Sequence, residues 1–328
     1  MTIENIVNIV GGKLLNEPKV KKVESATIYP SKVENGDLFF ALDKESAKKA
    51  IENGAFAIVF DFDLEITDPE IAYIKVDSIK SATINFLRYI NLQKESKIYL
   101  FEDVEISLLK MIVSRRTNIY TIISDNWQKS FETILNSDYE IYITSSKELA
   151  SAISPNYCVQ ESMASGYIIS DSLLKTTFKI DKFIYQSVSM PPFLFDRLRR
   201  VVKFCQEHQI EYDINRLKYP KEFKPIYIQN DLTPAPFGTT DRVLIFSNSL
   251  NIIQEALEYL KKEGKWIKSI VLTPPKTKLE NLNKPIWYKD LFDAKEVLKK
   301  EYYNYAFCYN INPEDILNKE DIDYSLFN

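Results

Sequence analysis

Glycine is scarce in this chain, which has 7 glycine residues among its 328 residues. Average usage would give roughly 23. Glycine lets a backbone lie close to phosphate groups, because it has no side chain and tolerates backbone angles that other residues avoid. A chain this poor in glycine therefore has few places where a phosphate-binding loop could form.

Histidine and cysteine are also rare and dispersed along the chain. The single histidine, His208, has no second histidine and no cysteine cluster beside it, so it is a poor candidate for a metal ligand. The three cysteines, Cys158, Cys205 and Cys308, form no CxxC pair, and we expect reduced, mostly buried thiols. The sequence predicts no metal site, and it places His208 at a solvated helix position.

Long apolar runs are missing as well. No window approaches the roughly 18 uncharged apolar residues of a membrane span, and no basic region followed by an apolar core opens the chain. The net charge of −4 gives no electrostatic reason to expect nucleic acid as a partner. With 45% apolar and 27% charged residues, the composition is typical of a globular cytoplasmic protein, and we expect neither a membrane span nor a secretory signal.

The most informative stretch that is present runs from Val33 to Phe60. Asn35-Gly36-Asp37 has the residues of a tight turn, and the apolar run Leu38–Leu42 after it predicts a buried strand. A helix is then expected to end at Gly54, before a second buried strand at Phe56–Phe60. Strand, helix and strand at this spacing indicate a compact parallel α/β unit.

The same alternation continues along the chain and predicts an α/β fold with mainly parallel sheets. Expected helices are Thr2–Val10, Lys80–Leu92, Val104–Arg115, Trp127–Leu135, Ser145–Ile153, Phe195–His208, Leu250–Lys262 and Phe292–Tyr302. Other expected strands are Val20–Ile28, Tyr73–Val76, Lys97–Phe101, Asn118–Ile123, Tyr139–Ile143, Arg242–Phe246, Trp266–Leu272 and Tyr305–Tyr309, with Pro225–Ile228 as an edge strand. The periodicity weakens between Asn156 and Ile184, where no element is predicted.

The stretch around Gly36–Leu42 resembles the N-terminal domain of the Mur ligases. Gly36–Leu42 matches that family's Gly-Asp-Leu-Phe-x-Ala-Leu strand, and Asn53–Ala55 matches the Asn-Gly-Ala that ends its next helix. Thr2–Val7 followed by Gly11-Gly12 is similar to the family's first helix and turn. Mur ligases are cytoplasmic enzymes that add amino acids or dipeptides to UDP-N-acetylmuramic acid, and the match is closest to the late-acting members.

The resemblance implies three domains. Residues 1–93 would form the N-terminal domain of UDP-sugar-binding type, and residues 94–236 a shortened central ATPase-like α/β domain. Residues 237–328 would form a C-terminal Rossmann-like α/β domain, since Ile245–Asn251 is similar to the strand and asparagine-rich turn that open this domain in the ligases.

The central domain of the ligases opens with a strand and a glycine-rich loop ending in Gly-Lys-Thr, which holds the phosphates of ATP. Here the strand is followed by Glu102–Ser107, which contains no glycine, no lysine and three carboxylates. These carboxylates would repel a triphosphate, and their side chains would prevent close backbone approach. We therefore expect neither ATP nor magnesium as a cofactor, and we assign no catalytic residue.

The UDP site implied by the resemblance is also altered. An Asp-Ser-Arg-like triplet of the ligases is replaced by Tyr29-Pro30-Ser31, and the loop after Leu42 is shortened to Asp43–Ser46. Ser25, Thr27 and Ser31 are the residues through which a UDP-sugar could still bind.

The preferred interpretation is a Mur-ligase-like cytoplasmic protein that has lost ATP-dependent peptide ligation. It would act as a non-catalytic binding or scaffold protein with a protein partner, linked to peptidoglycan precursor synthesis. The alternative is an active or altered UDP-N-acetylmuramoyl-peptide ligase, or a UDP-sugar-binding enzyme.

Two segments keep further alternatives open. Glu102, Asp103 and Glu105 could bind a cation, or they could form a solvated acidic loop that complements the dipole of the following helix. Residues 231–242 could form a ligand-binding loop or a proline-stiffened connector between domains.

Overall fold

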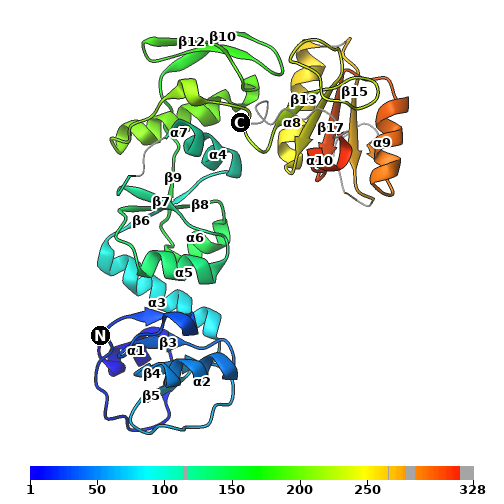
Figure 1. Cartoon of the computed structure of the whole chain (residues 1–328). Helices are drawn as coiled ribbons and strands as arrows, with labels where there is room; N and C mark the ends of the chain where they lie inside the picture. The colour runs from blue at the N-terminus through cyan, green and yellow to red at the C-terminus, as the bar shows by residue number, and fades with distance from the viewer. Residues whose placement is uncertain (114–116, 265, 276, 278–284, 318–328) are drawn as a thin grey trace. The chain divides into compact units, whose positions relative to one another are not determined.

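The computed structural model describes residues 1–113, 117–264, 266–275, 277 and 285–317 (Figure 1). The chain divides into two compact units: Met1–Phe101 with Arg116–Gln160, and Glu102–Arg115 with Glu161–Asn328. Residues 94–236 are thus distributed over both units, and the domain boundaries after residues 93 and 236 stay a prediction. The end of the predicted helix Val104–Arg115 and the final residues 318–328 lie outside the described residues.

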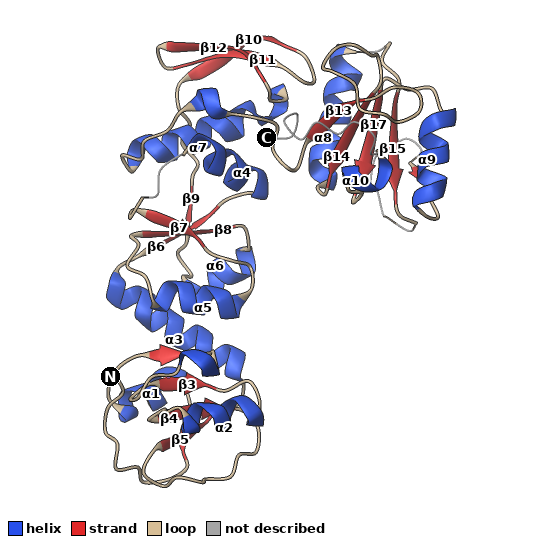
Figure 2. Cartoon of the chain, in the orientation of Figure 1, coloured by secondary structure: helices blue, strands red, loops and turns tan. Residues whose placement is uncertain are grey.

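The first sheet of the first unit has the order β1-β5-β4-β3-β2. Figure 2 shows β3, β4 and β5 of this sheet with helices α1 and α2 near them. Its strands are β1 (Lys13–Leu14), β2 (Ala26–Thr27), β3 (Leu38–Phe40), β4 (Ala57–Phe60) and β5 (Ala72–Lys75). The pairs from β2 to β5 are parallel, and β1 is antiparallel to β5. The predicted strand Val20–Ile28 was too long, because the backbone N–H groups of Val20, Val23 and Glu24 bond to Glu70, Met1 and Gly36 instead of to a sheet neighbour.

Both faces of this sheet are buried. Phe40 and Val59 pack into a core with α1 (Ile3–Val10) and α3 (Ile79–Lys94), whereas Phe39 and Ile58 pack on α2 (Lys44–Glu52). The turn before β3 and the turn before β4 are hydrogen-bonded to each other, since the Gly36 N–H donates to the Gly54 carbonyl at 3.1 Å. Gly36 and Gly54 have a positive φ, 104° and 97°, so each turn needs its glycine for a backbone shape that other residues rarely adopt.

The second sheet of this unit is parallel throughout, with the order β7-β8-β6-β9. Its strands are β6 (Lys97–Leu100), β7 (Tyr120–Ile122), β8 (Ile141–Thr144) and β9 (Cys158–Val159), and its helices are α5 (Trp127–Leu135) and α6 (Lys147–Ile153). Figure 1 shows α3 between the first sheet and α5. The Phe40 ring lies 5.3 Å from Phe86 on α3 and 5.2 Å from Phe131 on α5, so one continuous core joins the two sheets.

The second unit begins with α4 (Asp103–Ile112) and contains an antiparallel sheet that the sequence did not reveal. Its strands are β10 (Gly166–Asp171), β11 (Thr176–Ile180) and β12 (Phe183–Val188), in that order. The sheet packs on α7 (Phe195–Glu207), where the Phe178 and Phe195 rings lie 5.1 Å apart. Short 3-10 turns, η2 (Pro192–Leu194) and η3 (Ile214–Arg216), flank α7, as η1 (Pro30–Lys32) follows β2 in the first unit.

The last sheet has the order β13-β14-β17-β15-β16. Its strands are β13 (Lys224–Tyr227), β14 (Val243–Ser247), β15 (Ser269–Thr273), β16 (Ile286–Trp287) and β17 (Tyr305–Tyr309), and its helices are α8 (Leu250–Glu263), α9 (Leu291–Lys300) and α10 (Pro313–Ile316). The prediction of an edge strand at Pro225–Ile228 is confirmed by β13, which pairs with β14 alone and in antiparallel fashion. An edge position suits Pro225, because proline has no N–H to donate to a second neighbour.

The expectation of mainly parallel sheets flanked by helices is therefore confirmed. No helix in the described part of the chain is long and apolar enough to cross a membrane.

Candidate functional site

The three candidate UDP-binding residues lie beside β2 and in η1, and two of them have partners inside the protein. The Thr27 hydroxyl is buried and donates to Glu132 Oε1 at 2.6 Å. The Ser25 hydroxyl donates to the Asp37 carboxylate at 2.5 Å. Ser31 is exposed in η1. A role for these residues in binding a UDP-sugar stays a prediction; Ser25 is exposed like Ser31, whereas Thr27 is buried.

Glu132 on α5 contacts the segment that holds the candidate UDP-binding residues, and the sequence did not predict this contact. Its side chain is 7% exposed, and Oε1 also accepts the Ile28 N–H at 2.9 Å. Oε2 accepts from Lys32 Nζ at 3.1 Å and from Asn136 Nδ2 at 3.2 Å. The carboxylate thereby fastens α5 to β2 and η1, and it holds the Thr27 hydroxyl that was expected to face a ligand.

The start of α4 follows the strand β6, which is the place of the phosphate loop in the resembled family. The Glu102 N–H, which begins this turn, donates to Glu105 Oε2 at 2.9 Å. The first turn of α4 thus presents the carboxylates of Glu102, Asp103 and Glu105, and one of its N–H groups is already occupied by an anion. A helix start of this kind has its favourable electrostatic partners within the protein.

Two arginines of α7 pair with these carboxylates. Arg197 Nε donates to Glu102 Oε2 at 2.7 Å, and its two terminal nitrogens hold Glu255 of α8 in a bidentate contact, both at 2.7 Å. Arg200 donates to Glu105 Oε1 at 2.6 Å and to Glu102 Oε1 at 3.1 Å. We call these five residues the arginine–glutamate network.

The arginine–glutamate network is partly buried, and burial shifts the pKa of one of its carboxylates. Burial raises the pKa of Glu105, against the opposing effects of the Glu102 N–H and the Arg200 charge. Arg197 is 16% exposed and Arg200 is 22% exposed, so their ion pairs are shielded from water more than ordinary surface pairs. The acidic segment is partly solvated, since the Glu102 side chain is 50% exposed and Asp103 is exposed, and its carboxylates stand at the start of α4 where they complement the helix dipole. Glu102 and Glu105 are also bound by arginines, which leaves them less available to a cation.

A second buried carboxylate contacts α4 from the connector before β13. Glu222 is 1% exposed, and its Oε1 accepts from the Ser107 hydroxyl at 3.0 Å. Its Oε2 is buried with no hydrogen-bond partner among the described residues. Burial raises the pKa of Glu222, because the charged form is poorly solvated there. Across the described residues, no group of three or more histidine, cysteine, aspartate or glutamate side chains could hold a metal ion.

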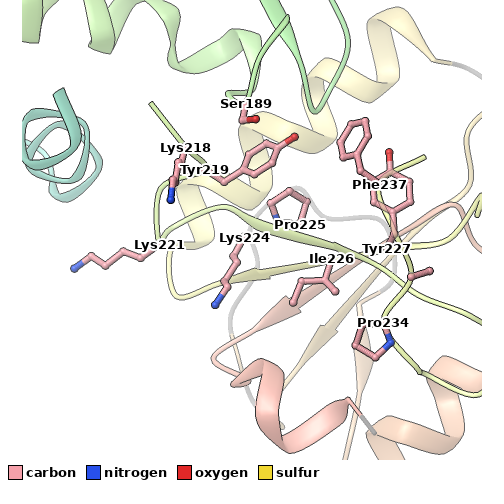
Figure 3. Close-up of a pocket in the computed structure, with 11 residues that line it drawn as sticks. Ser189, Lys218, Tyr219, Lys221, Lys224, Pro225, Ile226, Tyr227, Pro234 and Phe237 are labelled. Carbon is pink, nitrogen blue, oxygen red and sulfur yellow. The ribbon is translucent and has the colours of Figure 1, made fainter. Parts of the chain in front are cut away.

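A pocket of about 420 Å³ lies at β13 and the connectors on either side of it (Figure 3). Its lining combines aromatic rings and prolines with lysines: Ser189, Lys218, Tyr219, Lys221, Lys224, Pro225, Ile226, Tyr227, Pro234, Ala235 and Phe237. A cavity of this size is within the usual range for ligand sites. The sequence analysis considered only one part of this place, residues 231–242, as a ligand-binding loop, and it did not single out the lysines and rings that come from the other segments.

Interactions behind the pocket wall fix several of these side chains. Lys175 Nζ donates to the Ser189 hydroxyl at 2.8 Å and lies 4.9 Å from the centre of the Phe237 ring. Burial lowers the pKa of Lys175. The Tyr219 hydroxyl donates to the Leu174 carbonyl at 2.8 Å, and burial raises the pKa of Tyr219. The aromatic wall is thus held in place before any ligand arrives.

Residues 231–242, for which two interpretations were open, turn back on β13. Ala235 N–H donates to the Tyr227 carbonyl at 2.8 Å, and Gln229 N–H donates to the Thr233 carbonyl at 2.8 Å. Arg242 closes the segment: it is 8% exposed, donates to Asn230 Oδ1 at 2.9 Å and stacks on the Tyr303 ring at 4.4 Å. The segment is an ordered connector that also supplies one wall of the pocket.

Comparisons with known proteins show which solved structures share this fold. No protein-family model matches the chain, and no curated protein matches it in sequence. Solved structures do match, among them a MurF ligase from Thermotoga maritima in complex with ADP, with 10% identity, a TM-score of 0.55 and coverage of 89% of this chain and 95% of that chain. The D-alanyl-D-alanyl-adding ligase of UDP-N-acetylmuramoylalanyl-D-glutamyl-2,6-diaminopimelate from Acinetobacter baumannii matches with 12% identity, a TM-score of 0.52 and coverage of 96% of both chains.

A further structure of MurF from Acinetobacter baumannii matches with 12% identity and a TM-score of 0.50, covering 83% of this chain and 78% of that chain. At these identities the likeness is one of fold. The chain has a Mur-ligase-like α/β fold over most of its length, as the residues around Gly36–Leu42 led us to expect.

Proposed function

We propose that this protein uses a Mur-ligase-like fold without ATP-dependent ligation and acts as a cytoplasmic, non-catalytic binding or scaffold protein linked to peptidoglycan precursor synthesis. The observation that carries the proposal is the arginine–glutamate network at the start of α4. Where a nucleotide-binding relative needs open N–H groups and a cation, this chain has the carboxylates of Glu102 and Glu105 bound to Arg197 and Arg200.

Electrostatics makes this helix start a poor place for a triphosphate. Two like unit charges about 4 Å apart repel by about 4 kcal/mol at an effective dielectric constant of about 20. A phosphate at the first turn of α4 would meet Glu102, Asp103 and Glu105 together. Drawing Arg197 towards the phosphate would offer no relief, because Glu255 would then lose a bidentate partner.

Thermal unfolding with added ligands tests the proposal. The protein is heated with Mg²⁺-ATP, with a UDP-muramoyl peptide, with both, and with neither. A ligand at about 100 times its dissociation constant adds roughly 2.7 kcal/mol to the free energy of unfolding, which raises the midpoint visibly. The Thermotoga maritima MurF ligase with ADP is the positive control, since its solved structure contains that nucleotide.

We expect no rise of the midpoint with Mg²⁺-ATP and no ATP hydrolysis when the UDP-muramoyl peptide is present. A rise with Mg²⁺-ATP, or hydrolysis stimulated by the peptide compound, would restore the ligase and contradict the proposal. A rise with the UDP compound alone would instead make the protein a nucleotide-sugar binder, against a purely scaffolding role.

A further inference from the structure

The pocket at β13 has two chemically different sides (Figure 3). Tyr219, Tyr227 and Phe237 line one side, and the lysines of the connector line the other. The described lining residues include no aspartate or glutamate, so the pocket is positively charged next to an aromatic wall. An occupant that matches both sides must combine negative charge with an apolar, ring-bearing part.

The basic side presents several separate charges. Lys218, Lys221 and Lys224 follow one another at intervals of three residues, and Figure 3 shows their ammonium groups apart from one another and pointing in different directions. Lys221 Nζ lies 3.6 Å from the buried Glu222 carboxylate, which compensates part of its charge. Charges arranged in this way suit several carboxylates along an extended chain better than they suit one phosphate group.

The backbone around the pocket also favours carboxylates over a phosphate group as the ligand. Compact phosphate sites use converging backbone N–H groups, often on glycine. Here Pro225 and Pro234 line the cavity and have no N–H to offer. The recognition chemistry of the pocket therefore comes from lysine side chains and aromatic rings.

The aromatic side of the pocket has an exposed surface on which the ring of a ligand could pack. Phe237 is 55% exposed, which is a large apolar surface to leave in water. Its ring lies 4.9 Å from the ring of Tyr227 and has Lys175 Nζ on it at 4.9 Å. An aromatic side chain entering beside Phe237 would complete a cluster that is already ordered.

We infer that this pocket binds an acidic peptide segment with an aromatic side chain, presented by a partner protein. The inference rests on the proposed scaffold function and names the chemistry of its partner. The aromatic side chain would pack beside Phe237 and Tyr227, and the flanking carboxylates would pair with Lys218, Lys221 and Lys224.

Fluorescence anisotropy with a labelled synthetic peptide, GDEDWEDEG, tests the inference on the full chain. Two companion peptides separate the contributions: one has alanine in place of tryptophan, and one has asparagine and glutamine in place of all acids. We expect the parent peptide to bind more tightly than both, and its affinity to fall as salt is added, because Lys218 and Lys221 are exposed to solvent.

Variants of the pocket locate the binding. Replacing Lys218, Lys221 and Lys224 together by alanine should weaken binding about tenfold, as the charge pairs of two exposed lysines and one partly buried lysine contribute in sum. Phe237→Ala should weaken the parent peptide and leave the alanine-containing peptide unchanged. The matched control replaces three exposed lysines of the same unit outside the pocket, Lys182, Lys261 and Lys299, by alanine, and it removes the same charge.

The inference is overturned if the pocket and control triple variants weaken binding equally, if the companion peptides bind as well as the parent, or if uridine monophosphate displaces the label more effectively than unlabelled peptide. That last result would assign the pocket to a nucleotide. These failures are distinct from a failure of the proposed function, which shows as a response to Mg²⁺-ATP whatever the peptide does.

Discussion

Glu132 offers the sharpest test of how the first unit is held together. We predict that Glu132→Ala strongly destabilises this unit, whereas Glu132→Gln costs far less. The carboxylate is 7% exposed and accepts the Thr27 hydroxyl and the Ile28 N–H on one oxygen. Alanine removes the acceptor and leaves both donors buried without a partner.

The magnitude follows from these contacts. Each buried donor without a partner costs about 1–3 kcal/mol, and the contact with the largely exposed Lys32 contributes at most about 1 kcal/mol. Glu132→Ala should therefore lower the free energy of unfolding by about 4 kcal/mol in sum. Glu132→Gln retains an oxygen for Thr27 and Ile28, but its NH2 group replaces the oxygen that accepts from Lys32 and Asn136. It loses those two contacts together with the charge, so its cost should be about 1–2 kcal/mol.

Urea unfolding followed by circular dichroism measures the global effect, and hydrogen exchange of the Ile28 amide measures the local one. The control is Glu148→Ala, because Glu148 is 83% exposed and its ion pair with Lys80 at 3.2 Å should contribute less than about 1 kcal/mol. The reasoning is refuted if Glu132→Ala is no more destabilising than Glu148→Ala, or if the Ile28 amide exchanges at an unchanged rate.

Three further predictions concern other parts of the molecule. Arg197→Ala should lower the free energy of unfolding by about 1–3 kcal/mol in urea titrations, since it leaves the partly buried Glu255 carboxylate without its bidentate partner and leaves Glu102 with Arg200 alone, whereas Lys182→Ala should stay within about 0.5 kcal/mol. Because burial raises the pKa of Glu222 in the folded protein, the folded state holds this proton more tightly than the unfolded state, and stability from this group rises as pH falls. Urea unfolding between about pH 8 and about pH 5 should show the wild type gaining stability relative to Glu222→Gln, and a constant difference would contradict the assignment. Phe39→Ala empties a fully buried position and should cost about 3–5 kcal/mol, and a loss below about 1 kcal/mol would show that the core is not packed as described.

The elements that the sequence predicted best are those with local signals. The helix at Trp127–Leu135 was predicted with its observed bounds, because an apolar face and the Asn126 cap define it. Strands β3 and β4 were predicted from short apolar runs next to Gly36 and Gly54. In each case the information lies within about ten residues of chain, which is the range over which periodicity and capping act.

The antiparallel strands β10 to β12 lacked such a signal. Tyr167, Phe183 and Ile184 are exposed although they are large and apolar, so the alternation expected of a half-buried strand is blurred. Register shifts between Ile168 and Ser170 and within β11 disturb the pattern further. A strand with a bulge and apolar residues on both faces cannot be distinguished from a loop by its period.

For the candidate site, the sequence predicted which residues are missing but not which contacts the remaining residues make. The missing glycines and lysine of Glu102–Ser107 are visible in the sequence, but the partners of its carboxylates are not. Arg200 is 95 residues away from Glu105, and Arg197 is 58 residues away from Glu255. Likewise, the hydrogen bond between Glu132 and Thr27 joins residues that are 105 positions apart in the sequence. Pairings over such distances depend on the tertiary fold, which periodicity does not encode.

The arginine–glutamate network connects the proposed loss of nucleotide binding with the stability of the second unit. Its carboxylates hold three helices of this unit, α4, α7 and α8, through Arg197 and Arg200. Restoring glycine and lysine at Glu102 and Glu105 would therefore leave both arginines without their carboxylates at α4 and weaken the unit before any nucleotide could bind. Under the proposed function, this helix start makes an internal contact where a relative would hold a ligand, and stability and nucleotide binding would make opposite demands on the same residues.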